Sequence, residues 1–490
     1  MTINLDLLIP EILVGSLAFI ILGLDLFLKS KYKEYIAYIA ATGLILVLIF
    51  SIIPIWNTKA NIYGDILVLD GYAIFFKAFF LTFGAVLILS SKNYVGNNFS
   101  YIAEYYSIVI FTILAMMFMV SSAEILTAYI SLELLSFSLY VLVAFNRFNN
   151  RANEASIKYI LLGAFSSAIL LYGVSQIYGH LGTTNLVQIQ QALSMNSEMS
   201  LGLIIGFSMF IVGFLFKIGI VPFHMWVPDV YEGSATPVTA YLAVLVKVAI
   251  VALFIRVLVV GLMPIAQDWQ LILIGFSIVT MVVGNVVALI QSNIKRLLAY
   301  SSIGHAGYIL LGVAAIGTLD QKGLILVDFS RLIVNGIILH LVSYSLASIA
   351  IFLCIDIIFG NSEEEQIDSM KGLHDRSPLM SLLITASLIS LGGLPIFAGF
   401  TSKFYLFNSI GTQISLWYVG IAIITSLISL YYYLYVIRKI YIDTNKDKTV
   451  INLPILTKGI LVFLLFALIF IGIYPNILME FIYHASESLL

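Results

Sequence analysis

Runs of about twenty apolar residues follow one another along the whole chain, with short polar segments between them. A helix of that length crosses the roughly 30 Å hydrocarbon layer of a bilayer. Hydrophobic residues make up 61% of the chain and charged residues only 10%, so we predict an all-α polytopic membrane protein. We expect about fourteen transmembrane helices, over residues 7–28, 35–55, 71–90, 105–120, 123–145, 156–178, 201–221, 236–258, 269–290, 297–317, 332–358, 379–409, 414–437 and 458–478.

The composition also excludes several classes of function. A single cysteine, Cys354, excludes disulfides and cysteine-ligated zinc or iron–sulfur clusters. The net charge of −2 argues against a nucleic-acid partner, because no basic surface is available to neutralise phosphates. The sequence shows no metal-ligand spacing, catalytic triad or phosphate-binding glycine loop. The start, MTINLDLL, lacks a basic signal-peptide region, so the first helix is expected to stay in the protein.

Two of the expected helices are predicted to be broken, one near Pro222 and one near Pro395. Proline cannot continue a helix, and both prolines lie in glycine-containing segments next to a lysine. Broken helices in separate halves of a chain are typical of transporters built from repeated helix bundles. We expect four divisions. Residues 1–104 form a three-helix N-terminal extension, and residues 105–258 form a first helix bundle, which is a proton channel according to the resemblance described below. Residues 259–437 form a second helix bundle, and residues 438–490 form a C-terminal loop and the last helix.

Lysine and arginine distribution predicts the orientation. The segments after odd-numbered helices contain Lys29, Lys31, Lys33, Lys92, Arg147, Arg151, Lys295, Arg296, Lys371, Arg376, Arg438, Lys439, Lys446, Lys448 and Lys458. The segments after even-numbered helices contain only Lys59, Arg256, Lys322 and Arg331. Both termini are therefore expected on the outer, positive side of the membrane.

The charges inside apolar runs are the candidate functional residues. A lysine at the bilayer centre costs about 2.5–3.5 kcal/mol on insertion scales. Lys217 and Lys247 are therefore expected to line a water-containing path for ions or substrate. Glu133, in YISLELLSFSLY, is either neutral or paired with a cation from another helix. The alternative is an ion pair that only fixes helix packing. Lys403, beside the second break, is the fourth candidate.

Other ionisable residues have weaker signals. Lys77 is interpreted as a side chain that reaches the membrane surface. Lys158 either reaches the surface in the same way or has a functional role, and its position alone does not separate the two. His305, in LLAYSSIGHAGYILLG, is either a hydrogen-bonded core histidine or a proton relay, and His340 is similar. His224 is expected to brace the break at Pro222. The acidic run Glu363, Glu364 and Glu365 is interpreted as a solvated inner loop.

Three long motifs in order carry a family resemblance. They are LFKIGIVPFHMWVPDVYEGSATPVTAYLAVLVK, IKRLLAYSSIGHAGYILLG and GGLPIFAGFTSKFYLF, and NEASIKYILLGAFSSAILLYG precedes them. Together they resemble the antiporter-like subunits of respiratory complex I, more narrowly subunit 2 of the mitochondrial enzyme, called subunit N in bacteria. The resemblance implies an antiporter-like fold with two inverted five-helix repeats. Ala235 stands where the family usually has a proline, in an EGSPTP-like run, so one backbone restraint near the start of the eighth helix is absent.

The resemblance also implies roles for matching residues. Glu133 and Lys217 would form the key ion pair, Lys247 the central relay, and Lys403 the step toward the outer side or a neighbouring subunit. Lys158 and His305 match a modulator of the pair and a link in the hydrophilic axis, whereas His340 matches no family residue.

The implied function is proton translocation in NADH:ubiquinone oxidoreductase, with no redox chemistry in this chain. NADH, FMN, iron–sulfur clusters and quinone would bind partner subunits. The partners would be neighbouring antiporter-like and small membrane-arm subunits, and lipids. The expected location is the mitochondrial inner membrane, with the bacterial plasma membrane as the alternative. Two other functions stay open: a subunit of a multi-subunit cation/proton antiporter, and a scaffold whose charges only hold helices together.

Overall fold

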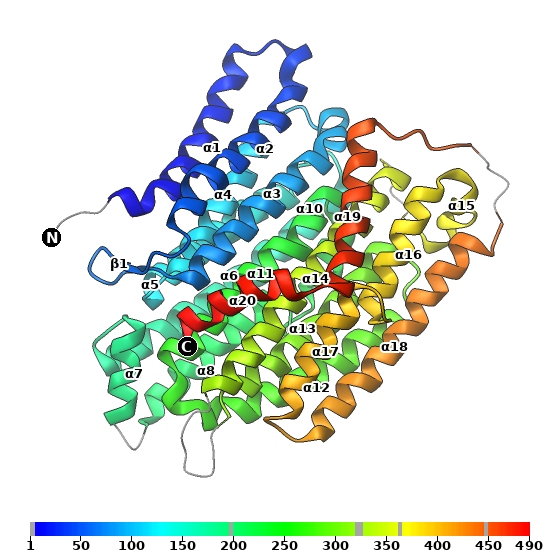
Figure 1. The fold of residues 1–490 in the computed structure, drawn as a ribbon. Helices are drawn as coiled ribbons and strands as arrows, with labels where there is room; N and C mark the ends of the chain where they lie inside the picture. The colour runs from blue at the N-terminus through cyan, green and yellow to red at the C-terminus, as the bar shows by residue number, and fades with distance from the viewer. Residues whose placement is uncertain (1–4, 196–198, 319–326, 361–364, 445–448) are drawn as a thin grey trace.

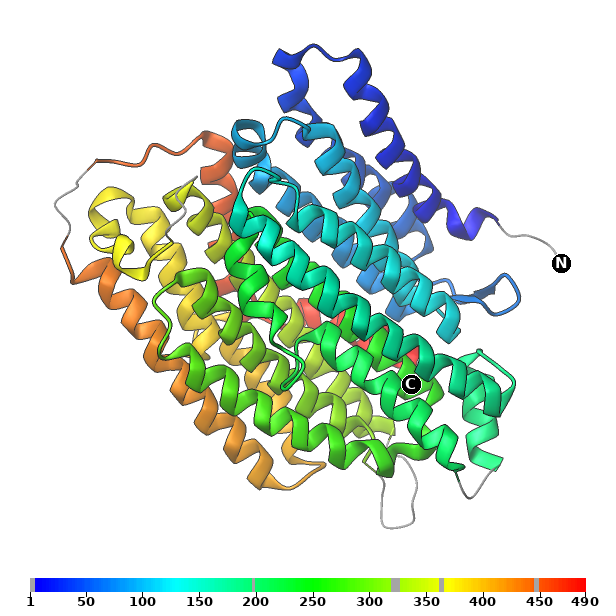
Figure 2. The ribbon, with the colours of Figure 1, turned by 180° about the vertical axis from the view of Figure 1, so that it is seen from behind.

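The computed structural model describes residues 5–195, 199–318, 327–360, 365–444 and 449–490, and nearly all of them are helical. Long helices lie side by side in one bundle, as both views of the ribbon show (Figure 1, Figure 2). Five charges considered above lie outside the described residues: Lys322, Glu363, Glu364, Lys446 and Lys448.

The N-terminal part contains three long crossings and a small hairpin. Its elements are η1 (Leu5–Leu8), α1 (Ile9–Phe27), η2 (Ser30–Tyr35), α2 (Ile36–Val47), η3 (Leu48–Ile52), η4 (Ile53–Ile55), β1 (Ala60–Ile62), β2 (Leu67–Leu69) and α3 (Gly71–Asn98). Strands β1 and β2 pair antiparallel, with Asn61 opposite Val68.

The first half of the remaining bundle contains the first broken helix. Its elements are α4 (Ile102–Ser121), α5 (Ile125–Val143), α6 (Asn150–Leu181), α7 (Leu186–Met195), α8 (Leu201–Ile218), α9 (Trp226–Gly233), α10 (Thr236–Tyr241), η5 (Leu242–Val246), α11 (Lys247–Arg256) and η6 (Val257–Gly261). Elements α10 to η6 form one continuous crossing of 26 residues.

The second half contains the second broken helix. Its elements are η7 (Met263–Ile265), α12 (Ala266–Ala288), α13 (Ile294–Ile316), α14 (Val327–Phe359), η8 (Ile367–Met370), α15 (Leu373–Arg376), α16 (Pro378–Gly392), α17 (Ala398–Gly411), α18 (Leu416–Tyr441), α19 (Ile455–Ile473) and α20 (Asn476–Leu489).

The number and order of crossings agree with the sequence prediction. Among the described residues, 13 helices are long and apolar enough to span a membrane, and the pair α16 and α17 supplies the remaining, interrupted crossing. The elements that were not predicted include the β1–β2 hairpin, α7 and α20. Helix α20 turns away from α19 and lies across α3 and α14 (Figure 1).

Both predicted breaks use the same local chemistry. Helix α8 ends before Gly219, whose φ is +86°, and α16 ends before Gly393, whose φ is +81°. This left-handed conformation terminates a helix and is accessible to glycine without strain. Pro222 and Pro395 follow within three residues and prevent the helix from resuming in line.

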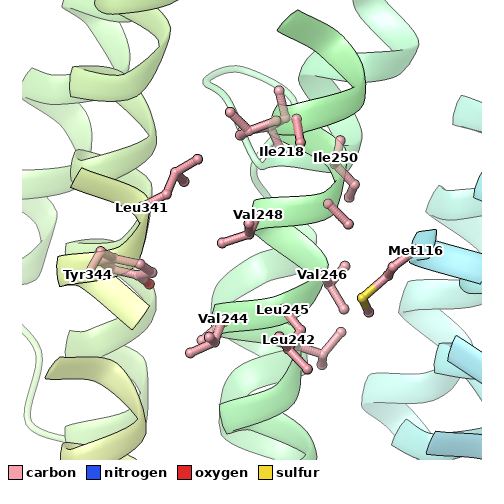
Figure 3. Packing of buried hydrophobic residues seen from close by; sticks show 14 of the residues in the cluster. Met116, Ile218, Leu242, Val244, Leu245, Val246, Val248, Ile250, Leu341 and Tyr344 are labelled. Atoms are coloured by element: carbon pink, nitrogen blue, oxygen red, sulfur yellow. The ribbon is translucent and has the colours of Figure 1, made fainter. Parts of the chain in front are cut away.

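The crossing that contains Lys247 lies at the centre of the bundle, and nearly all of its residues are buried. Figure 3 shows its side chains, such as Val244 and Val248, between Met116 of α4 and Leu341 of α14. Its hydrogen bonding changes to π-helical just before Lys247, at η5. A π-helical turn inside an α-helix often marks a functional site.

Two buried ion pairs hold the N-terminal helices, one between α3 and α11 and one between α1 and α3. Arg256 donates to both carboxylate oxygens of Asp70 at 2.8 Å, and Asp70 also caps α3 by accepting from Ala73 N. Lys77 is 1% exposed and lies 2.6 Å from Glu11 Oε1. The interpretation of Lys77 as a surface-reaching side chain is therefore wrong: a carboxylate on α1 compensates its charge inside the bundle.

Candidate functional site

The first polar centre joins α5, α6 and α8. Lys217 Nζ lies 3.4 Å from Glu133 Oε1 and donates to Ser136 Oγ at 2.8 Å and to Ser167 Oγ at 3.1 Å. Ser167 in turn donates to the same Glu133 oxygen at 2.5 Å. Lys217 reaches this position because it lies in the last turn of α8, next to the break. The structure thus brings Glu133 and Lys217 together, with two serine hydroxyls completing the site.

Lys247 occupies a second centre, between α11, α13 and α14. Its amine donates to Ser302 O at 2.8 Å and to Ser302 Oγ, and it lies 5.6 Å from the centre of the Tyr344 ring. Among the described residues, no carboxylate forms an ion pair with Lys247. Neutral oxygens and an aromatic face stabilise the charged form of a buried amine less than an ion pair with a carboxylate does.

Two histidines form the third centre. His305 Nδ1 lies 3.2 Å from His340 Nε2, and His340 Nδ1 lies 3.1 Å from Ser402 Oγ. The ring of Tyr344, which contacts Lys247 on one side, lies 5.2 Å from the His305 ring. The histidine pair therefore lies between the Lys247 centre and α17, which carries Ser402.

Lys403 forms the fourth centre at the second break. Its amine donates to Leu391 O and to Ser426 Oγ, both at 2.7 Å, and lies 5.3 Å from the centre of the Tyr308 ring. It also lines a mainly apolar cavity of about 530 Å³ between α16, α17 and α18. As with Lys247, no carboxylate among the described residues forms an ion pair with Lys403.

Lys158 lies apart from these centres. Its amine contacts Glu154 at 2.8 Å and Asp229 at 2.9 Å, and its side chain is 43% exposed. Arg296 contacts the same Asp229 at 2.8 Å and Glu232 at 2.8 Å. Burial opposes ionisation of Asp229, but the hydrogen bonds from Lys158 and Arg296 outweigh it and lower the pKa of Asp229. The structure therefore places Lys158 in an ion cluster at the helix ends.

Several residues of these centres were not predicted from sequence. Ser136, Ser167 and Ser302 have no distinctive pattern, because serine is common in transmembrane helices as a helix-packing residue. His340 carried a usable signal, since it is an ionisable residue within an apolar run, but its partner became evident only in three dimensions. His224 lies within the first break, two residues after Pro222, and its role as a brace stays a prediction.

The arrangement is suited to holding and passing protons. Three lysines and two histidines lie in separate buried centres, each with hydroxyl, carbonyl or aromatic neighbours. Intramembrane ionisable residues of this kind mark ion pathways or proton relays. A neutral lysine amine and a neutral histidine ring each bind one proton reversibly when burial disfavours the charged form.

Comparison with known proteins identifies the class. Residues 122–429 match the family described as NADH:quinone oxidoreductase/Mrp antiporter, transmembrane. The curated NADH-quinone oxidoreductase subunit N of Trichlorobacter lovleyi is 38% identical over 449 residues, which cover 91% of this chain and 89% of that protein. The chain belongs to the NADH:quinone oxidoreductase and Mrp antiporter family, and within that family to the subunit N group.

Solved structures agree on the fold. A chain of respiratory complex I from Thermus thermophilus with bound aureothin superposes with a TM-score of 0.80 at 26% identity, covering 96% of this chain and 99% of that one. A chain of the Mrp complex from Dietzia superposes with a TM-score of 0.84 at 19% identity, covering 99% and 98%. The second likeness concerns the fold alone. The antiporter-like architecture expected from the sequence is therefore confirmed.

Proposed function

We propose that this chain is a membrane-arm subunit of a proton-pumping NADH-quinone oxidoreductase and carries protons across the membrane. The observation that carries the proposal is the series of buried lysines at Lys217, Lys247 and Lys403, each in its own polar centre within one helix bundle. The subunit N identity of a relative that spans most of the chain supports the assignment. Electron transfer from NADH to quinone takes place in partner subunits.

The Glu133–Lys217 pair is the adjustable element in this proposal. At 3.4 Å the two charges are close but not in tight contact, and the serine hydroxyls compete for both. A change of charge or conformation from the quinone end moves Lys217 toward or away from Glu133, and so changes how firmly it holds its proton. Moving one charge against the membrane potential costs about 2.3 kcal/mol per 100 mV. A pKa change of two units corresponds to roughly 2.7 kcal/mol, which is the required size.

Beyond this pair, the proton path continues through Lys247, the His305–His340 pair and Lys403 toward the outer side or a neighbouring subunit. The Tyr344 ring joins the first two of these centres, and Ser402, which contacts His340, directly precedes Lys403 on α17. Lys158 acts as a modulator through Asp229, on the element that directly follows the first break.

The proposal extends to partners, cofactors and location. The chain works beside other antiporter-like and small membrane-arm subunits, and it binds no NADH, FMN, iron–sulfur cluster or quinone itself. The relatives are bacterial, so the expectation of a mitochondrial membrane has no support, and we assign the chain to the bacterial plasma membrane. Both termini face the outer side, because lysine and arginine are concentrated after odd-numbered helices.

The alternative of a cation/proton antiporter subunit is less well supported. The subunit N relative is 38% identical, whereas the Mrp chain is 19% identical and shares the fold. Purification in mild detergent separates the two functions. We expect a large assembly that contains flavin and oxidises NADH with quinone. A smaller assembly without flavin or redox activity contradicts the proposal and favours the antiporter.

A further inference from the structure

Two adjoining cavities open at the inner ends of the helices. One has a volume of about 300 Å³ and the other about 350 Å³, and both are lined by Tyr94, Asn98 and Gly360. Their walls are the C-terminal ends of α3 and α14 and the beginnings of α6, α10, α13 and α19. In the proposed orientation all of these ends lie on the inner side, where protons are taken up.

Asp356 of α14 lines one of the cavities and lacks a partner at one oxygen. It is 9% exposed, and within the described part of the chain its Oδ1 has no hydrogen-bond donor. A buried carboxylate oxygen without a donor is costly, so such a group is suited to accept a proton that arrives through the cavity. The ionisable side chains that interact with Asp356 are Tyr94, Tyr105, Tyr106, Lys295 and Glu365.

The second cavity contains a buried ion pair that includes Glu365, so the interpretation of Glu365 as part of a solvated loop is wrong. Lys295 Nζ lies 2.7 Å from Glu365 Oε1 and donates to Ser234 O at 2.9 Å. Thr236 Oγ1 lies 3.4 Å from the same carboxylate oxygen. Burial raises the pKa of Glu365, and the positive charge of Lys295 opposes the shift. Glu365 therefore holds a proton more readily than an exposed glutamate does.

Polar groups lie between this cavity and the central lysine. Ser234 Oγ lies 2.8 Å from Thr239 Oγ1, which contacts Tyr231 O at 3.0 Å. That oxygen is the backbone carbonyl of Tyr231, whereas the side-chain hydroxyl of Tyr231, at the far end of its ring, lies 3.5 Å from Ser302 Oγ, and Ser302 accepts from Lys247. The segment between the first break and α11 thus places polar groups at the cavity, through Ser234 and Thr239, and beside Ser302 and the amine of Lys247, through the Tyr231 hydroxyl.

We propose that these cavities are the proton-uptake site for Lys247, with Asp356 and Glu365 as the carboxylates that collect the proton. A proton from inner-side water binds a carboxylate oxygen, and the hydroxide left behind stays in the bulk. The proton then passes over the polar segment of Ser234, Thr239 and Tyr231 to the Tyr231 hydroxyl and Ser302, and from there to the neutral amine of Lys247, and the carboxylate is free to accept another. Lys295 keeps the site from accumulating negative charge. The inference rests on the proposed function and adds where its protons enter.

The test uses the complete oxidoreductase with Asp356→Asn, reconstituted in vesicles and normalised to flavin content. We expect proton pumping to slow by roughly tenfold or more at alkaline pH, where protons are scarce, and to approach the unaltered rate at mildly acidic pH. Asp375→Asn, at an exposed position on the same side, serves as the control and should change neither. Asp356→Glu retains the carboxyl group and should restore most of the rate.

Tyr231→Phe provides a second test, because it removes only the hydroxyl near Ser302 and should slow pumping with the same pH dependence. If Asp356→Asn fails to assemble, Asp356→Glu and Tyr231→Phe decide the question. Unaltered rates and pH profiles in Asp356→Asn, or in Tyr231→Phe where that variant alone assembles, overturn the uptake site. If changes at Lys217 and Lys247 also leave pumping unaltered, the proposed function itself fails.

Discussion

The hydroxyl of Ser167 bridges Glu133 and Lys217. It donates to Glu133 Oε1 at 2.5 Å and accepts from Lys217 Nζ at 3.1 Å, while the two charged groups are 3.4 Å apart. A single neutral side chain thus contributes to how strongly the pair holds its proton. A hydrogen bond to a charged group contributes about 1.5–3 kcal/mol, comparable with the cost of moving one charge against the membrane potential.

Ser167→Ala should therefore impair coupling while leaving the complex assembled. We expect pumping to fall several-fold, because the pair loses its shared hydroxyl but keeps both charges. Proton uptake and NADH oxidation in vesicles measure the effect. Ser166→Ala is the matched control: Ser166 is also buried on α6, and among the described residues its hydroxyl donates to Gly213 O and contacts neither Glu133 nor Lys217. Equal effects of the two substitutions contradict the assignment to Ser167.

Ser302→Ala should slow the reaction at the next centre. The substitution removes the hydroxyl that Lys247 contacts but leaves the backbone carbonyl of Ser302 as an acceptor, so the loss should be smaller than that of Lys247→Ala. Ser345→Ala is the control, because within the part of the chain that the structure describes its hydroxyl donates to Leu341 O of its own helix. A Ser302 variant as impaired as Lys247→Ala indicates a structural defect instead.

His340→Gln should interrupt the path between His305 and Ser402. The glutamine amide retains hydrogen-bonding capacity but does not take up a proton at physiological pH, so pumping should fall and assembly should be kept. His374→Gln, on an exposed face of α15, should have no effect. Unchanged pumping in His340→Gln removes this residue from the path.

The Glu11–Lys77 pair leads to a prediction about stability. Glu11→Gln leaves Lys77 buried with no anionic partner and should destabilise the N-terminal helices by about 3–5 kcal/mol. The double variant Glu11→Leu with Lys77→Met replaces the pair with apolar side chains and should recover most of that loss. Thermal unfolding of the purified complex measures both. Additive losses in the double variant argue against a direct pair.

Apolar run lengths were sufficient to predict the crossings, and glycine followed by proline was sufficient to predict both breaks. Helices α7 and α20 were missed because their mixed composition does not resemble a membrane span. The misinterpretation of Lys77 has a similar origin: its partner Glu11 is distant in sequence, so no local pattern reveals the pair. The proximity of Glu133 and Lys217, 84 residues apart, was expected from the family resemblance and not from spacing.

The central claim is that Lys217 must release and rebind a proton. Lys217→Arg tests it most directly, because arginine keeps the positive charge near Glu133 but does not lose its proton at physiological pH. The measurement is the rate of proton pumping and the protons moved per NADH by the assembled, flavin-normalised complex in vesicles. We predict normal assembly with severely reduced pumping or slowed, still coupled turnover. Unaltered pumping and turnover in assembled Lys217→Arg contradict the account and leave Lys217 a structural role only.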